Sequence, residues 1–232
     1  FVNNEIGEIY DIADVAKISH EMGILFHTDA TQAFGHIPIN VKELDCDFLS
    51  LSGHKFHSPK GVGILYIKDP DKFNPLLYGG QQEANHRAGT ENVASIVGMG
   101  KAAELYNFSS ERDKRCREIQ NKFVDVFSFW QDVYFNTDVA HSISSTLNIA
   151  FKNVESESLM LFLDMDGICV SAGSACNSAS LEPSHVLKAI GTPEEYLFNS
   201  IRLSWDDTLT EEEIGYTIES IKKNVMKVRG YI

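Results

Sequence analysis

A lysine in a polar loop is the side chain of this sequence with the clearest potential for covalent chemistry. Lys55 lies in the loop 53–60 between two apolar runs, and Ser52 and His54 flank it. A lysine that is held near a carbonyl group and partly desolvated can lose its proton and form a Schiff base. The flanking hydroxyl and imidazole could bind anionic oxygens. On composition alone, an exposed basic loop is the stronger alternative.

A cysteine among small residues is the second candidate. Cys176 lies in the run 170–178, where small neighbours leave a sulfur atom uncovered. Its alternative role is that of a small hydrophobic residue in a turn. Cys169, by contrast, stands between two bulky apolar residues, so we expect it to be a buried structural cysteine. Cys46 and Cys116 have no special setting and are expected to be inert.

Two charged residues lie in apolar runs that predict strands. Asp29 closes the run 24–29, and capping of a helix or turn explains an acid there equally well. Arg202 lies in the run 199–204, and a planar guanidinium can hold a carboxylate through two hydrogen bonds. Its alternative role is a surface salt bridge. Two acids follow at 206–207, and because they would oppose anion binding, we expect them to face away.

The first half of the chain alternates helical and strand patterns. A helix is expected at 11–22, where Asp11 can cap the start and the following glycine the end. The residues expected on its buried face are Ile12, Val15, Ala16 and Met22. A buried strand is expected at 24–29, and two more strands are expected at 47–52 and 61–67. This alternation favours an α/β sheet with a functional site at the strand ends.

The second half begins with two long helical patterns, at 93–106 and 110–130, and the second could connect two domains. Shorter strands and helices follow and predict a smaller α+β domain. The strands are expected at 144–151, 168–171 and 199–204, and the helices at 156–165, 183–190 and 210–228. Thr210 with Glu213, and Thr192 with Glu195, have the spacing of capping boxes. We expect part of a large domain at 1–108, a connecting helix at 109–130 and a small domain at 131–232.

The composition is that of a globular protein. The 232 residues are 43% hydrophobic and 23% charged, with a net charge of −13. An acidic chain repels phosphate backbones, so direct nucleic-acid binding is not expected. No apolar run approaches the roughly 18–20 residues of a membrane span, and we expect no signal peptide. The four cysteines lack zinc-site spacing, which predicts no metal site and a reducing compartment, the cytoplasm or an organellar matrix.

Both loops resemble motifs of the cysteine desulfurase family, within the class V aminotransferase group. The lysine loop reads Ser-x-His-Lys followed by x-x-x-Pro-Lys-Gly-x-Gly, and the cysteine loop reads Ser-x-Gly-Ser-Ala-Cys. The motifs appear in the family's order over essentially the whole chain. The resemblance implies a pyridoxal 5′-phosphate (PLP) enzyme of fold type I. The chain would be part of a large domain with a mixed, mostly parallel sheet, followed by a smaller α+β domain.

The resemblance also implies how the cofactor is held. Lys55 would bind PLP covalently, and Ser52 and His54 would contact its phosphate. Asp29 and Gln32 lie in a segment that is similar to the family's strand motif. There the aspartate keeps the pyridine nitrogen protonated, so that the ring can withdraw electrons, and the glutamine hydrogen-bonds the ring hydroxyl.

Further residues would bind the substrate or complete the site. Asn4, which we prefer to Asn3, resembles the residue beside the ring hydroxyl and the substrate carboxylate, and Arg202 matches the arginine that clamps that carboxylate. Thr90 resembles a threonine that touches the cofactor phosphate of the partner subunit in a homodimer; a flexible surface loop is the alternative there. Cys176 resembles the cysteine that receives sulfur as a persulfide.

The implied activity is removal of sulfur from L-cysteine, which yields L-alanine and a persulfide for an iron–sulfur scaffold or another sulfur-carrier protein. Three alternatives stay open. One is a lyase of the same fold that acts on selenocysteine or cysteine sulfinate. Another is an aminotransferase of the same fold, which would not need Cys176. The last is a non-catalytic binding domain of a sulfur-transfer complex.

The start of the sequence predicts a piece of a longer protein. Phe1 and Val2 read as the end of a buried strand whose beginning is missing. In the family, a preceding stretch supplies a phosphate-binding loop and a histidine that stacks on the cofactor ring. We therefore expect weak or absent PLP binding by these residues alone, and a complete site if another chain supplies the missing part.

Overall fold

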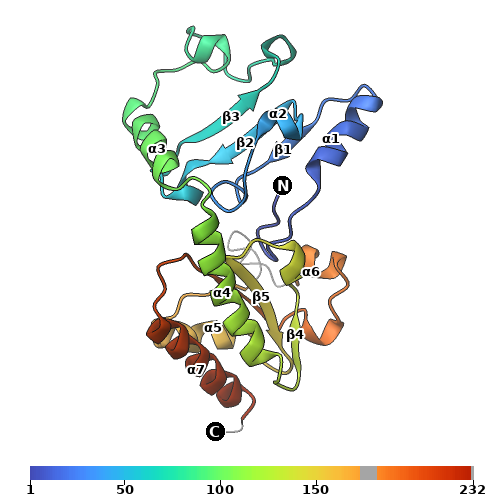
Figure 1. Cartoon of the computed structure of the whole chain (residues 1–232), viewed down its shortest axis with the longest axis vertical. Helices are drawn as coiled ribbons and strands as arrows, with labels where there is room; N and C mark the ends of the chain where they lie inside the picture. Colours follow the sequence, from blue (N-terminus) through green and yellow to red (C-terminus); the bar gives the residue numbers. More distant parts are fainter. Residues whose placement is uncertain (173–181, 231–232) are drawn as a thin grey trace. The chain divides into compact units, whose positions relative to one another are not determined.

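The computed structural model describes residues 1–172 and 182–230, which form two compact units (Figure 1). The first unit comprises Phe1–Val2 and Tyr10–Ser109, and the second comprises Asn3–Ile9 and Ser110–Ile232. Within the described residues, none of the helices has both the length and the apolar composition that crossing a lipid bilayer requires.

The first unit is built on a three-stranded sheet. Its strands are β1 (His27–Asp29), β2 (Phe48–Ser52) and β3 (Gly63–Ile67), and its helices are α1 (Ile12–Glu21), α2 (Val41–Leu44) and α3 (Val93–Leu105). β1 runs parallel to β2, and β3 runs antiparallel to β2 on the other side. The expected mixed sheet is confirmed, and one of its two described strand pairings is parallel.

Helix α1 buries a narrower face than its sequence predicts. Asp11 caps it as expected, through a hydrogen bond from a first-turn amide. Ile12 and Ala16 are buried, but Val15 is 46% exposed and Met22 is 70% exposed. The expected four-residue face is therefore wrong, because the described residues cover only one i, i+4 stripe of the helix.

A carboxylate joins α1 to the start of β2. Asp47 Oδ2 accepts a hydrogen bond of 2.8 Å from the Phe26 backbone N–H and lies 2.8 Å from His20 Nε2. Burial raises the pKa of the Asp47 carboxyl, but the hydrogen bonds from Phe26 and His20 outweigh it, so the net shift is downward. The ionised acid thus fixes the helix beside the parallel strand pair.

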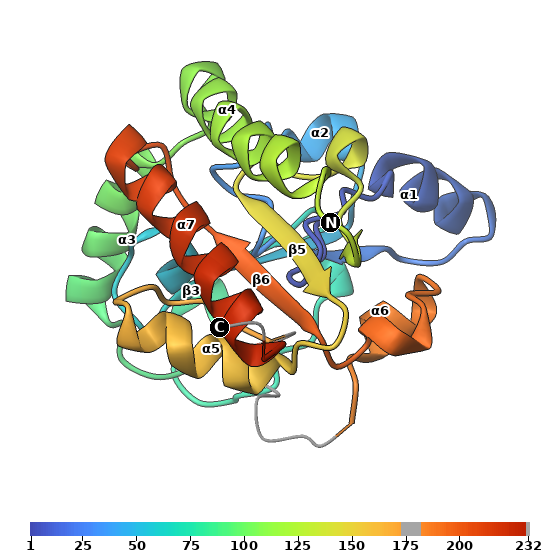
Figure 2. The same ribbon diagram turned by 90° about the horizontal axis from the view of Figure 1, so that it is seen from below.

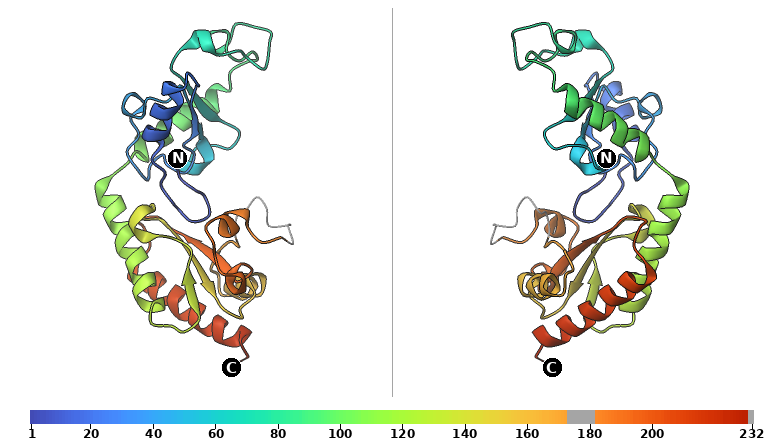
Figure 3. Two further views of the ribbon diagram at one scale, coloured as in Figure 1. Left: turned by 90° about the vertical axis from the view of Figure 1, so that its right-hand side faces the viewer. Right: turned by 90° about the vertical axis from the view of Figure 1, so that its left-hand side faces the viewer.

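The second unit is built on an antiparallel sheet in the order β4-β5-β6. Its strands are β4 (Val133–Phe135), β5 (Thr146–Phe151) and β6 (Ser200–Ser204), and its helices are α4 (Ser110–Phe127), α5 (Ser156–Met165), α6 (His185–Ala189) and α7 (Glu211–Val228). Figures 2 and 3 show α4 and α7 beside this sheet. β4 has only three residues and gave no recognisable sequence pattern.

One face of this sheet is apolar. Leu147, Ile149 and Phe151 alternate along β5 and belong to a buried cluster with side chains of α4, α5 and α7. From α4 the cluster takes Ile119, Phe123 and Phe127, which recur every fourth residue and therefore lie on one face of the helix. Each such side chain contributes roughly 1.5–3 kcal/mol on burial, so this face carries much of the stability of the second unit.

The opposite face is buried but polar. Asn148 of β5 is fully buried, and its side-chain carbonyl accepts a hydrogen bond of 2.8 Å from Asn136. Asn136 also donates to the Ser200 hydroxyl at 3.0 Å and accepts from the Thr192 hydroxyl at 2.7 Å. Buried polar groups are tolerated only when they are paired in this way. The segment Asn3–Ile9 lies on this face, because Asn148 also donates to the Glu5 carbonyl.

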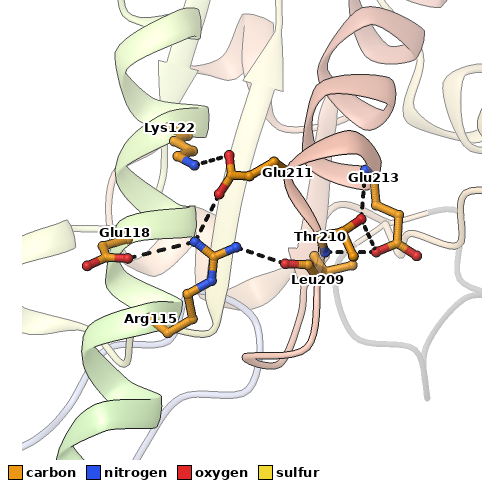
Figure 4. A network of polar contacts seen from close by, with 7 residues as sticks. All are labelled: Arg115, Glu118, Lys122, Leu209, Thr210, Glu211 and Glu213. Carbon is orange, nitrogen blue, oxygen red and sulfur yellow. Dashed lines mark hydrogen bonds and ion pairs between the residues drawn. The ribbon is translucent and has the colours of Figure 1, made fainter.

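Thr210 begins α7 with the predicted capping box (Figure 4). Its hydroxyl accepts from the Glu213 amide, and the Glu213 carboxylate accepts from the Thr210 amide. Glu211 pairs with Arg115 at 3.1 Å and with Lys122, both on α4. Hydrogen bonds from Lys122 and Arg115 lower the pKa of the Glu211 carboxyl. These exposed pairs align the two helices rather than stabilise them strongly.

Two sequence expectations in the second unit are wrong. The spacing of Thr192 and Glu195 predicted a capping box, but only the short 3-10 helix Glu194–Tyr196 forms, without a side-chain cap. The Thr192 hydroxyl instead donates its hydrogen bond to the Asn136 side chain. The strand expected at 168–171 is reduced to an isolated bridge at Ser171. The domain limits expected at 108 and 131 stay a prediction.

Replacing Asp47 with asparagine tests the joint between α1 and β2. We expect the substitution to lower the free energy of unfolding by about 1–2 kcal/mol at pH 7, because a charge-assisted hydrogen bond is lost. Since the folded-state pKa of Asp47 is depressed below 3.8, its contribution is fully present well above 3.8 and disappears as the pH falls through the folded-state value.

Urea denaturation at neutral and at acidic pH measures this difference. Asp71→Asn is the matched control, because Asp71 is exposed and makes no side-chain hydrogen bond among the described residues. A penalty for Asp47→Asn that does not shrink in acid would contradict the assignment.

Candidate active site

The structure holds Lys55 on a rigid turn directly after β2. Gly53 and Phe56 are buried, whereas His54 and Lys55 between them are exposed. Phe56 packs against Phe34, with ring centroids 4.6 Å apart. The turn closes through the Gly53 carbonyl, which accepts from the Ser58 amide. Lys55 is therefore presented to solvent by a fixed backbone, and its surroundings within the described residues do not bury it.

Gly53 has to be glycine for this turn to close. A Cβ atom at this position would lie 2.7 Å from Ser58 Oγ and 2.9 Å from the Val62 carbonyl oxygen. Helix α3 also packs closely on this loop, because a Cβ atom on Gly98 would lie 3.0 Å from the Pro59 ring. The sequence places small residues where the lysine turn needs close backbone contacts.

Ser52 and His54 already form a pair. The Ser52 hydroxyl lies 2.8 Å from His54 Nδ1, so the two polar side chains that flank the lysine turn converge. A hydroxyl and an imidazole N–H are suitable donors for an anionic oxygen. Their expected contact with one anionic group stays a prediction.

Asp29 lies at the same edge of the sheet as the lysine turn. Because β1 and β2 are parallel, with Asp29 opposite Ser50, both strands end at one edge. Asp29 is exposed, and its Oδ1 atom accepts a hydrogen bond of 2.8 Å from the Thr31 amide. The structure therefore supports the turn-capping role, and this role leaves the second carboxylate oxygen available for a ligand. Gln32 lies in the turn that follows and is partly buried.

Thr90 lies in an exposed loop of the first unit, immediately before α3. The preceding Gly89 has a φ of 111° and donates to the Gln82 side chain at 3.1 Å. Thr90 itself is exposed, and the described residues place no other site residue in this loop. Its expected contact with a partner subunit stays a prediction.

Arg202 and Asn4 meet within the second unit. Arg202 Nη1 donates a hydrogen bond of 2.7 Å to the Asn4 carbonyl. The Asn4 side chain is exposed and makes no hydrogen bond among the described residues, whereas the Asn3 side chain accepts from the amides of Glu5 and Ile6. Asn4 is thus the asparagine whose side-chain amide makes no hydrogen bond among the described residues, and the preference for Asn4 over Asn3 as a site residue stays a prediction.

The two acids after β6 face other partners. Asp206 accepts from the amide and the hydroxyl of Thr208, and Asp207 pairs with Arg112 at 3.6 Å. They are therefore occupied away from Arg202, as expected from the sequence.

Arg202 pairs with Ser171, which precedes the expected sulfur-carrying cysteine in the sequence. Ser171 and Arg202 exchange two backbone hydrogen bonds, of 2.6 Å and 3.2 Å. Cys176 follows five residues later in the sequence and lies outside the described residues.

The other cysteines have different settings. Cys169 is exposed, so the expectation of a buried cysteine is wrong. Bulky neighbours do not bury it, because Cys169 lines a cavity of about 490 Å³ together with Trp205 and Tyr216. Cys46 and Cys116 are buried, and burial raises the pKa of the Cys116 thiol to about 11. A thiol with that pKa is unreactive near neutral pH, as expected.

Comparison with known proteins identifies the family of this chain. A family model described as Aminotransferase class-V matches residues 1–216. The chain belongs to the class-V aminotransferase family. It is 48% identical over 229 residues to the cysteine desulfurase IscS of Dictyoglomus turgidum, covering 98% of this chain and 58% of that protein. The chain thus spans less than two thirds of the length of this relative.

Two solved structures resemble the chain. A protein described as NifS-like matches with a TM-score of 0.85 and 33% identity, over 100% of this chain and 60% of its own. A structure described as SspA in complex with cysteine matches with a TM-score of 0.71 and 34% identity, over 90% of this chain and 58% of its own.

The class-V aminotransferase family depends on PLP, and the described residues fit this cofactor chemically. The lysine turn offers an exposed primary amine, the hydrogen-bonded pair of Ser52 and His54 offers donors for a phosphate, and Asp29 offers a carboxylate at the same sheet edge. An amine, an acid and anion-binding donors are the groups that a pyridine aldehyde phosphate requires. The donor set therefore fits PLP.

Sequence reasoning missed Glu5. This acid is 2% exposed and bonds to Ser184, which is distant in the sequence. Its only sequence signal is its place directly after Asn4, in a motif in which only the asparagines were considered as site residues.

The substitution Gly53→Ala tests the lysine turn. The added Cβ would collide with Ser58 and with a backbone carbonyl, so we expect a loss of about 1–3 kcal/mol and a thermal midpoint lower by a few degrees. Gly100→Ala in α3 is the control, because a Cβ there meets nothing within 4 Å and helix propensity favours alanine. A midpoint of Gly53→Ala equal to that of the unsubstituted protein would show that the turn is not tightly packed.

Proposed function

We propose that the complete protein is a PLP-dependent cysteine desulfurase. It removes sulfur from L-cysteine and releases L-alanine, and the sulfur remains as a persulfide on Cys176. The observation that carries the proposal is a rigid lysine turn at the end of a parallel strand pair, in a chain that also has an asparagine–arginine pair. The similarity to a cysteine desulfurase and to a protein solved with cysteine supports the substrate.

The residues of the first unit would hold the cofactor. PLP, when bound, supplies an electron sink that stabilises negative charge at the Cα atom of an amino acid. Lys55 provides the amine that binds the aldehyde and later carries the Cα proton. Ser52 and His54 donate to the phosphate, and Asp29 and Gln32 hold the ring nitrogen and the ring hydroxyl.

Arg202 and Asn4 would orient the substrate. A guanidinium binds a carboxylate through two parallel hydrogen bonds, which fixes the direction of the Cα–H bond. The existing bond from Arg202 Nη1 to the Asn4 carbonyl restrains the guanidinium. The Asn4 amide is available to donate to the same carboxylate.

Cys176 would take the sulfur. Its thiolate attacks the sulfur of the bound cysteine, forming an S–S bond while the Cβ–S bond breaks. The electron pair of the broken bond stays on the carbon fragment, which takes up a proton and leaves as alanine. The persulfide then passes to an acceptor, which we propose to be an iron–sulfur scaffold or another sulfur-carrier protein.

Self-association is part of the proposal. Three apolar residues before the Thr90 loop are strongly exposed: Leu76 at 90%, Leu77 at 49% and Tyr78 at 79%. An exposed apolar cluster of this kind favours a protein interface, and a homodimer in which Thr90 reaches the partner's cofactor would use it. We place the protein in the cytoplasm or an organellar matrix, where its cysteines stay reduced.

Removing the lysine amine tests the cofactor assignment. We expect Lys55→Ala, made in the complete protein, to lose alanine release from L-cysteine by at least about a thousandfold, because both the covalent link and the proton carrier disappear. Lys60→Ala is the matched control, since Lys60 is an exposed lysine of the same loop. Retention of alanine release by Lys55→Ala would remove the basis of the proposal.

Removing the Cys176 thiol separates a desulfurase from an aminotransferase of the same fold. We expect Cys176→Ala to bind PLP normally but to form no protein persulfide and release no alanine, because no thiolate attacks the substrate sulfur. Cys169→Ala, which removes an exposed cysteine, is expected to retain activity. Full turnover of Cys176→Ala with an amino-group acceptor would favour the aminotransferase.

A further inference from the structure

Glu5 is a buried acid for which the proposed reaction has no use. The residue is 2% exposed, and its Oε2 atom accepts a hydrogen bond of 2.5 Å from the Ser184 hydroxyl. Removal of an ionised carboxylate from water is costly unless hydrogen bonds compensate for the lost hydration. A leucine of similar size would avoid this cost, so a buried side chain with a hydrogen-bond acceptor at this position requires a physical explanation.

Ser184 ties the acid to the start of α6. Its hydroxyl donates to Glu5 and accepts from the amides of Val186 at 3.1 Å and Leu187 at 3.4 Å. Val186 and Leu187 also pack on Ile6, which is 3% exposed. A polar bond and an apolar contact therefore fasten neighbouring residues of one turn to the same short helix.

The same turn supports Arg202. The Asn4 carbonyl accepts from Arg202 Nη1 at 2.7 Å, and the Glu5 carbonyl accepts from the Asn148 side chain at 3.2 Å. Asn148 stands opposite Arg202 in the β5–β6 pairing. A displacement of Glu5 would thus move the carbonyl that restrains the guanidinium, together with the available amide of Asn4.

The turn has little internal means of holding its position. The Asn3 side chain closes it by accepting from the Glu5 amide at 2.8 Å, and Gly7 adopts a φ of 76° at its end. These bonds set the local shape but do not attach the turn to the rest of the unit. Attachment comes from two groups of contacts. Side chains and amides of the sheet and the loops beside it donate to the carbonyls of residues 4–7, and the side chains of Glu5 and Ile6 contact α6. Of these, only the Glu5 bond joins a charged side chain of the turn to another element among the described residues.

We propose that Glu5 is a positioning residue for substrate recognition. Its carboxylate, bonded to Ser184, holds the turn so that Arg202 and Asn4 form a fixed receptor for the α-carboxylate of a free amino acid. This inference rests on the proposed function, in which that pair binds the substrate. Glu5 acts through the turn and does not itself contact the substrate.

Hydrogen exchange of the complete protein without substrate tests the anchor directly. Glu5→Ala and Ser184→Ala are each expected to raise the exchange rate of the amides of residues 5–9 by about tenfold or more, because both remove the same bond. Glu5→Gln keeps an oxygen acceptor for the hydroxyl and should stay near the unsubstituted rate. Unchanged exchange in Glu5→Ala would overturn the inference.

Glu8→Ala is the matched control for the exchange experiment. Glu8 has the same side chain in the same segment, but its carboxylate makes no hydrogen bond within the described part of the chain. We expect its exchange rates to match those of the unsubstituted protein. An increase equal to that of Glu5→Ala would mean that the segment responds to any lost charge, which also overturns the inference.

Steady-state kinetics with L-cysteine and L-cysteinamide test the consequence for recognition. Cysteinamide lacks the carboxylate that Arg202 would bind. We expect Glu5→Ala to raise KM for L-cysteine about tenfold with kcat within about twofold, and to reduce the preference for cysteine over cysteinamide by a similar factor. A purely structural role would lower the amount of active protein and leave KM and this preference unchanged, which would contradict the inference.

The double substitution of Glu5 and Ser184 by alanine provides an internal check. Both single substitutions break the bond between Glu5 and Ser184, and Ser184→Ala also removes the cap of α6. The double variant should therefore raise KM no more than Ser184→Ala alone does. Multiplied effects would show that the two residues act independently.

Failure of this inference differs from failure of the proposed function. Absence of sulfur release from L-cysteine by the unsubstituted complete protein refutes the function, and substrate positioning by Glu5 then falls with it, whatever the exchange rates show. Normal turnover together with an unchanged KM for Glu5→Ala refutes the inference and leaves the function intact.

Discussion

The parallel pairing of β1 with β2 is the constraint on which the candidate lysine site depends. Because Thr28 stands opposite Leu49 in parallel register, both strands end at one edge, where Asp29 and the lysine turn follow them. An antiparallel pairing would send the two strand ends to opposite edges. The turn then converts this edge into a usable site, since its buried flanks at Gly53 and Phe56 leave only the intervening side chains free to act.

The second unit meets a different constraint, which is to order a charged side chain beside buried polar groups. Arg202 lies on the polar face of an antiparallel sheet, whose buried amides and hydroxyls are paired with one another. Such a network is rigid because each lost hydrogen bond would leave a desolvated polar group. The turn that contains Asn4 and Glu5 is bonded to this network through Asn148. Because the Arg202 guanidinium donates to the Asn4 carbonyl, the network also restrains the position of the guanidinium.

Local sequence patterns correctly predicted the features that depend on interactions between residues close together in the sequence. The polar loop around Lys55 and the capping box at the start of α7 follow from nearby residues, and both form as expected. These patterns gave wrong predictions where contacts with residues distant in the sequence determine the structure. Thr192 gives its hydroxyl to Asn136 rather than to a cap, and Cys169 is exposed in spite of apolar neighbours. The burial of Glu5 depends on a residue 179 positions away, which no local window can reveal.

The central claim, that Lys55 forms the covalent bond to PLP, can be measured by chemical trapping. The complete protein is incubated with PLP, reduced with borohydride and digested, and the modified peptide is identified by mass spectrometry. The account predicts a phosphopyridoxyl group on Lys55 and none on Lys60, although both lysines are exposed in the same loop. Labelling that is spread over surface lysines, or that spares Lys55, would contradict it.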